Sequence, residues 1–234
     1  GYLIARRGLG PDFNVLGLLA VASAGLYAIG MAMNDVADRN RDKTLAPGRP
    51  LPSGRITLRG AMTASALVIA AGAVAVRLLE PRPGPVQAMF AGAFVAIMVY
   101  DFLLKIPPVM GAIRFFNLLM GVAAGLRHAE AASAVQAGGV DSLHGAWLLG
   151  LPTLGYGTSL TFVSTREDGE GRKGLRWLGA VGMSAAALAP ALLGRAVALA
   201  PGLLLAAWIL WRASATPDRK GVMLMVRDGV AGFI

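Results

Sequence analysis

Three aspartates follow directly on a run of apolar residues, in the stretch from Asn34 to Lys43. At about 100° per helical residue, Asp35, Asp38 and Asp42 lie within an arc of roughly 60° on one face. Three like charges on one face repel one another unless a cation lies between them. Mg²⁺ prefers carboxylate oxygens and commonly bridges to substrate phosphates, so the spacing predicts a Mg²⁺ site.

Basic residues follow these acids closely and could bind an anion held by such a metal. The connection contains Pro47, Pro50 and Pro52, which are expected to stop any helix after Asp42. The cationic candidates in and around this connection are Lys43, Arg49, Arg55 and Arg59.

The composition places the chain among membrane proteins. Of its 234 residues 56% are hydrophobic, the mean hydropathy is +0.61, and the charged residues cluster between long apolar runs. These runs are close to the ~20 residues that span a bilayer. Residues 1–7 and 221–234 are interpreted as parts of an earlier and a later helix, so both ends are expected to be truncated. The apolar segments are 15–33, 57–79, 86–104, 109–129, 145–165, 174–194 and 196–212.

The distribution of charge predicts an orientation. When the loops are assigned alternately to the two faces, most of the 22 basic residues fall on one face, which is therefore expected to be cytoplasmic. A bacterial inner membrane is the expected location. The net charge of +9 is attributed to these loops rather than to nucleic-acid binding. Cysteine is absent, which excludes disulfides and thiolate metal sites.

A second polar connection, residues 164–174, again places acids and bases beside a spanning helix on the predicted cytoplasmic face. Two such loops at one face of a bundle indicate a shared site. The alternative is a pair of solvated loops, an interpretation that fits the second connection better than the first.

The resemblance to a known family rests on these motifs. N-D-x-x-D-x-x-x-D at 34–42, followed by R-P-L-P-S-G-R at 49–55, resembles the first signature of the UbiA superfamily of intramembrane prenyltransferases. The segment from Tyr100 to Lys105 resembles the Tyr-and-Lys segment that ends the family's fourth helix. The pattern G-x-x-R-x-x-N at 111–117 resembles its fifth helix, in the form found in the EboC-like branch.

This resemblance implies an all-α, polytopic membrane bundle of nine helices, forming one domain over 1–234 with its polar mouth on the cytoplasmic side. It implies a Mg²⁺-dependent transferase that moves a prenyl group from a polyprenyl diphosphate to an acceptor. Metal ions and basic side chains neutralise the departing diphosphate. The apolar bundle accepts the isoprenoid tail and excludes water that would quench the allylic cation.

The resemblance also implies roles for individual residues. Asp35, Asp38 and Asp42 are the first metal ligands, and Asp168 joins them as a catalytic residue and ligand, with Glu170 as a further ligand. The second motif departs from the family's D-x-x-x-D because Ser164 stands in the first position. The predicted substrate-binding residues are Asn34, Lys43, Arg49, Tyr100, Lys105, Asn117, Arg166 and Lys173.

Two other functions compete with this one. A catalytically weakened UbiA-like protein that binds or transports an isoprenoid lipid is favoured by the altered second motif. A CDP-alcohol phosphotransferase also uses intramembrane aspartates, but its D-G-x-x-A-R signature is absent after Asp38. No pattern in the sequence identifies the acceptor or the length of the prenyl donor.

Overall fold

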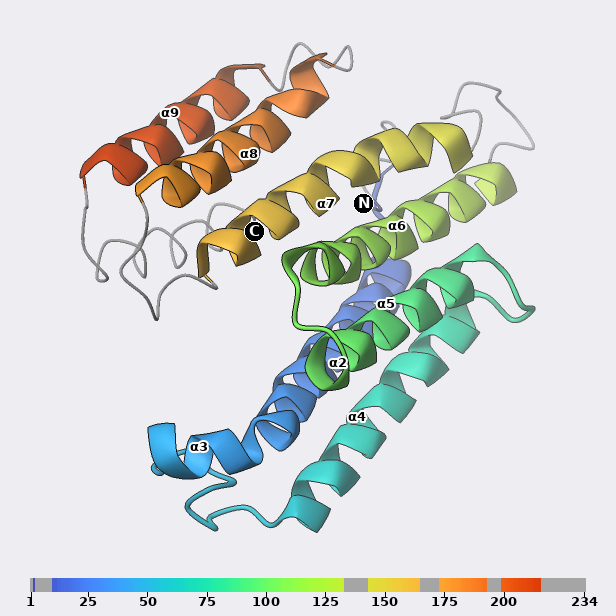
Figure 1. The fold of residues 1–234 in the computed structure, drawn as a ribbon. Coiled ribbons are helices and arrows are strands. Elements are labelled where there is room, and N and C mark those ends of the chain that lie inside the picture. The colour runs from blue at the N-terminus through green and yellow to red at the C-terminus, as the bar shows by residue number, and fades with distance from the viewer. Residues whose placement is uncertain (1, 3–9, 133–142, 165–172, 193–198, 216–234) are drawn as a thin grey trace. The chain divides into compact units, whose positions relative to one another are not determined.

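The structure, a computed structural model, describes residues 2, 10–132, 143–164, 173–192 and 199–215, and within these ranges its regular elements are all α-helices (Figure 1). The all-α prediction is therefore confirmed. Each of the predicted apolar segments corresponds to one long helix. The outer parts of the predicted nine-helix bundle, at 1–7 and 221–234, lie almost wholly outside the described residues. The helices are α2 (Phe13–Ala37), α3 (Arg39–Leu45), α4 (Leu58–Leu79), α5 (Pro85–Phe102), α6 (Pro107–Ala132), α7 (Leu143–Ser164), α8 (Lys173–Leu192) and α9 (Leu199–Ala215).

Local sequence explains where several helices begin. The Asp12 side chain accepts hydrogen bonds from the backbone N–H groups of Asn14 and Val15 and so caps α2. Thr57 caps α4 in the same way, through the N–H of Gly60. Pro85 is the first residue of α5, a position that needs no backbone donor.

Four of the described helices are long and apolar enough to cross a membrane: α2, α4, α5 and most of α6. Large apolar side chains point outward from them, including Val74, Leu78 and Val95, each more than half exposed. In water such surfaces would be costly, but hydrocarbon accommodates them. The chain is therefore an integral, multi-pass membrane protein.

Contacts within the chain divide it into two compact units, formed by residues 1–105 with 116–141 and by residues 106–115 with 142–234. α6 contributes its first part to the second unit and the rest to the first. The prediction of a single domain over 1–234 stays a prediction.

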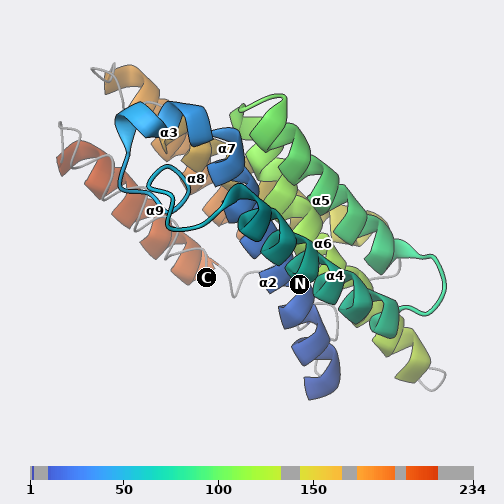
Figure 2. The same ribbon diagram turned by 90° about the horizontal axis from the view of Figure 1, so that it is seen from below.

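In the first unit, α2, α4 and α5 lie side by side (Figures 1 and 2). Small residues permit a close crossing of α2 and α4. A Cβ atom added at Gly25 would lie 3.1 Å from the carbonyl oxygen of Val68, and one at Gly72 would lie 3.2 Å from the Phe90 ring. Larger side chains at these glycines would push the helices apart.

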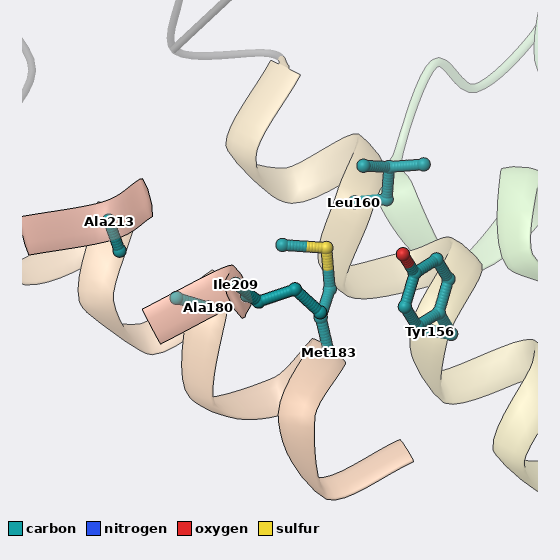
Figure 3. Packing of buried hydrophobic residues seen from close by; sticks show 6 residues of the cluster. All are labelled: Tyr156, Leu160, Ala180, Met183, Ile209 and Ala213. Carbon is teal, nitrogen blue, oxygen red and sulfur yellow. The ribbon is translucent and has the colours of Figure 1, made fainter. Parts of the chain in front are cut away.

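In the second unit, α7 packs on α8 and α8 on α9. Figure 3 shows the buried cluster that joins them, with Met183 of α8 between Tyr156 of α7 and Ile209 of α9. Close packing again requires glycine, because a Cβ atom at Gly182 would lie 2.3 Å from Ser159 Oγ. The second unit thus has its own packed interior.

The end of α2 differs from the sequence prediction. A continuous helix through Asp42 was expected, but α2 ends at Ala37 and α3 begins at Arg39, with Asp38 as the residue between them. Figure 1 shows α3 turning away from the axis of α2. α3 then continues beyond Asp42 to Leu45, and stops just before Pro47.

Candidate functional site

The candidate site lies in the first unit, where α2 ends and α3 begins. Asn34 and Asp35 occupy the last turn of α2, Asp38 is the residue at the bend, and Asp42 lies in α3. Two basic residues reach these side chains: Arg49 from the connection after α3, and Lys105 from the segment after α5. We call these six residues the acidic site.

Arg49 joins two of the three aspartates. Its Nη1 atom lies 2.6 Å from Asp42 Oδ2 and 3.4 Å from Asp35 Oδ1. The two aspartates lie on different helices, Asp35 in the last turn of α2 and Asp42 in α3, so Arg49 joins the two helices across the bend. Asp42 is buried whereas Arg49 is about half exposed, so the guanidinium covers the carboxylate from the solvent side.

Lys105 binds the remaining pair. Its Nζ atom donates to Asp38 Oδ2 at 2.7 Å and to Asn34 Oδ1 at 3.1 Å. Asn34 precedes Asp38 by one turn, so one ammonium group reaches both side chains. The prediction that Asn34, Arg49 and Lys105 lie with the aspartates is therefore matched by the structure.

The two basic residues divide the three aspartates into two ion-paired groups, because Arg49 binds Asp35 and Asp42 while Lys105 binds Asp38. Among the described residues, no three acidic or histidine side chains lie close enough to form a metal site. Their oxygen atoms are nevertheless the ligand type that Mg²⁺ prefers. Three carboxylates face two cations, so a divalent ion would take the place of a cation already present.

Tyr100 also lies near the acidic site. It is half-buried at the end of α5, and Asp38 and Asp101 are the charged groups that act on its hydroxyl. Lys43 is exposed in the last turn of α3. Arg55 turns instead onto its own loop, donating to the carbonyl of Gly48 and to Ser53 Oγ, so it braces the connection that carries Arg49.

Asn117 lies in another part of the first unit. Its Oδ1 atom accepts a hydrogen bond from Ser23 Oγ of α2 at 2.8 Å. Ser23 precedes Asn34 by three helical turns, roughly 16 Å along the helix at 1.5 Å per residue. Asn117 therefore contacts the middle of α2, away from the acidic site, and its predicted role in substrate binding stays a prediction.

The second predicted motif lies outside the described residues. This applies to Arg166, Asp168 and Glu170, whereas Lys173 begins α8 but its side chain is also outside the described part. Their predicted roles stay predictions.

Asp101, which is 7% exposed, was not among the residues predicted from the sequence to have a role. A carboxylate within an apolar span is itself a signal for function, and this one stands between Tyr100 and Lys105, two residues already selected. That signal was available in the sequence.

The fold and the site together define a helical membrane protein with an acid–base cluster at the end of its spanning helices. A model of the UbiA prenyltransferase family matches residues 1–221, and the chain belongs to this family. The recognition of the family from its first signature is thus confirmed.

Individual relatives match over shorter stretches. The chain is 38% identical over 111 residues to a digeranylgeranylglyceryl phosphate synthase of Methanoculleus marisnigri, covering 47% of this chain and 38% of that protein. It is 34% identical over 99 residues to the protein of the same name from Ignicoccus hospitalis, covering 42% and 31%. The matched segments thus span about a third of these relatives.

A solved structure concerned with digeranylgeranylglyceryl phosphate synthase in membranes resembles the whole chain. The TM-score is 0.66 with 17% sequence identity, over 99% of this chain and 86% of that one. At this identity the likeness shows the fold alone.

Proposed function

We propose that the chain transfers a prenyl group from a polyprenyl diphosphate to an acceptor. The observation that supports this most directly is the acidic site, in which Arg49 and Lys105 meet Asn34 and the three aspartates at the end of apolar helices. Membership of the family supports the same activity.

The two basic residues are suited to the departing diphosphate. Arg49 offers a guanidinium with several donors, and Lys105 an ammonium that is only about one-third exposed. Both would exchange carboxylate partners for phosphate oxygens. Their charge then stabilises the pyrophosphate more strongly as the carbon–oxygen bond breaks, which lowers the barrier.

The donor set suits Mg²⁺, which Asp35, Asp38 and Asp42 would hold, with Asp168 and Glu170 proposed as ligands from the second motif. When bound, the metal would supply further neutralisation of the leaving group. Tyr100 lies at the end of α5 near Asp38, and its aromatic ring would favour a cation formed beside it.

The acceptor is proposed from the names of the relatives. A product with two geranylgeranyl groups on glyceryl phosphate requires addition of a geranylgeranyl group to a glycerol phosphate lipid. Geranylgeranyl diphosphate and geranylgeranylglyceryl phosphate are therefore the first donor and acceptor to test. Membership of the EboC-like branch stays a prediction.

The decisive assay uses the purified full chain in proteoliposomes with these two substrates and Mg²⁺. Mass spectrometry should detect the prenylated lipid, and pyrophosphate should appear in equal amount. A protein that binds the donor but releases no pyrophosphate with any acceptor would instead be the weakened binder or transporter of isoprenoid lipids.

We further propose that the acidic site faces the cytoplasm of a bacterial inner membrane. The chain has no cysteine, so one introduced at the exposed Pro47 gives an unambiguous label. An impermeant maleimide should react with it only in inside-out vesicles. Reaction in right-side-out vesicles would reverse the orientation.

A further inference from the structure

A buried carboxylate without a partner lies in the last turn of α5. Asp101 is 7% exposed, and its Oδ2 atom has no hydrogen-bond partner. Buried polar atoms in native proteins are almost always paired, so this exception requires an explanation. The position is also electrostatically poor, because the carboxyl end of a helix disfavours negative charge. An unsatisfied carboxylate oxygen of this kind is characteristic of a functional site.

The surroundings of Asp101 place it beside the acidic site. The charged side chains that act on its carboxylate are Lys105 and Asp38, which are paired with each other at 2.7 Å. Asp101 belongs to the spanning helix itself, whereas Lys105 follows the end of that helix. In a prenyl diphosphate the reacting carbon is bonded directly to the diphosphate. A donor held by Lys105 would therefore bring that carbon into the neighbourhood of Asp101.

The other described carboxylates of the first unit are already engaged. Asp35 and Asp42 bind Arg49, and Asp38 binds Lys105. Glu80, which is equally buried, is bound by Arg127. Among the described residues, Asp101 is the only one with a buried carboxylate oxygen that lacks a hydrogen bond.

Alkylation of any hydroxyl or aromatic acceptor releases a proton, which needs a base. We propose that Asp101 Oδ2 accepts the proton that the acceptor loses; this inference rests on the proposed prenyl transfer. The donor's carbon–oxygen bond breaks and its electron pair leaves with pyrophosphate. The acceptor oxygen forms a bond to the freed carbon, and its proton passes to Asp101 Oδ2.

The test separates loss of the donor's diphosphate from alkylation of the acceptor. The full chain in proteoliposomes is given geranylgeranyl diphosphate and geranylgeranylglyceryl phosphate. In Asp101→Asn, formation of the prenylated lipid should fall by about 100-fold, the scale of a lost general base. Affinity for the non-hydrolysable geranylgeranyl thiodiphosphate should change by no more than about twofold, because Asp101 does not hold the donor.

Chemical rescue distinguishes a base from a residue that only supports the site. In Asp101→Gly, added formate should restore lipid formation without changing the affinity for the thiodiphosphate. Glu80→Gln is the matched control, since it neutralises an equally buried carboxylate at the opposite end of α5. It should leave the amount of product formed per donor consumed unchanged.

Three results would overturn the proposal: undiminished product formation by Asp101→Asn, a parallel loss of donor affinity, or no rescue by formate. Folding of each variant is checked by size-exclusion chromatography, and Asp101→Ser replaces any variant that does not fold. If the unaltered protein forms no product, the proposed function itself fails, and this inference fails with it.

Discussion

A buried carboxylate lies near each end of α5, and the two carboxylates differ in their hydrogen bonding. Before α5 begins, Glu80 is fully buried; its Oε1 lies 2.8 Å from Arg127 Nη1, and its Oε2 accepts from the N–H of Gln87 at 3.0 Å. Gly84 leaves the space that this carboxylate fills, since a Cβ atom there would lie 2.3 Å from Oε1. At the other end, Asp101 has no such partners.

This difference in hydrogen bonding distinguishes Glu80, which stabilises the fold, from the carboxylates near the acidic site, which are suited to bind a ligand. Glu80 links the α4–α5 connection to α6, and its bonding capacity is used within the fold. The acidic site instead contains exchangeable ion pairs made by partly exposed cations, and Asp101 beside it has a carboxylate oxygen without a hydrogen bond. Groups whose partners are all internal favour stability, whereas groups left to exchange partners favour binding of a ligand.

The largest effect is expected at the Glu80 end. Arg127→Met removes the cation from a fully buried carboxylate and should reduce the free energy of unfolding by about 3 kcal/mol. Thermal unfolding in detergent measures this loss. The double variant Arg127→Met/Glu80→Gln should recover part of it, because no unpaired charge remains. Equal stability of the single variant and the unaltered chain would contradict the assigned role of the pair.

A smaller effect, on binding rather than stability, is expected at the acidic site. Asp38→Asn should weaken Mg²⁺-dependent binding of a non-hydrolysable prenyl diphosphate by about 2 kcal/mol, the scale of one charged interaction. Isothermal titration calorimetry with and without Mg²⁺ measures the change. Unchanged binding would remove Asp38 from the proposed metal site.

Arg49→Gln should lower the affinity for the donor much more than it lowers the stability of the protein. Its side chain is 46% exposed, so loss of its ion pairs should lower the free energy of unfolding by no more than about 1 kcal/mol. Affinity for the same prenyl diphosphate analogue should nevertheless fall by about tenfold, since a charged donor to phosphate is lost. Arg55→Gln is the control, because Arg55 contacts only its own loop among the described residues. Equal losses of affinity in both variants would show that the loop, rather than Arg49, matters.

The smallest effect is expected for the stability of Asp101→Asn. Neutralising a buried carboxylate whose Oδ2 atom makes no hydrogen bond should leave the free energy of unfolding unchanged or raise it by up to about 1 kcal/mol. Glu80→Gln should lower it under the same conditions. If Asp101→Asn unfolds as readily as Glu80→Gln, the contrast between the two ends of α5 is wrong.

The spanning helices could be predicted because bilayer thickness fixes the length of apolar segments, and hydropathy alone reveals them. Arg49 and Lys105 were selected together with the aspartates because the motifs at 34–55 and 100–105 resemble those of one family. The division of the aspartates into two groups did not follow, because it depends on which carboxylates Arg49 and Lys105 reach in the folded chain.

Contacts between segments that are distant in the chain could also not be predicted from the sequence. Glu80 and Arg127 are 47 residues apart, and nothing in either segment shows that they meet. Arg55 was among the cationic candidates of this connection, but beside Gly54, whose φ is +74°, it donates back to its own loop at the carbonyl of Gly48. Such pairings depend on the path of the folded chain.

Because Arg49 binds two aspartates at once, we expect binding of the donor and binding of Mg²⁺ to be cooperative. One guanidinium nitrogen spans the bend, touching Asp35 on α2 and Asp42 on α3, so movement of this single side chain releases both carboxylates together. A phosphate that attracts Arg49 would thereby prepare two metal ligands in one step. Binding of the prenyl diphosphate should then raise the affinity of the protein for Mg²⁺, and bound Mg²⁺ should raise the affinity for the prenyl diphosphate by the same factor.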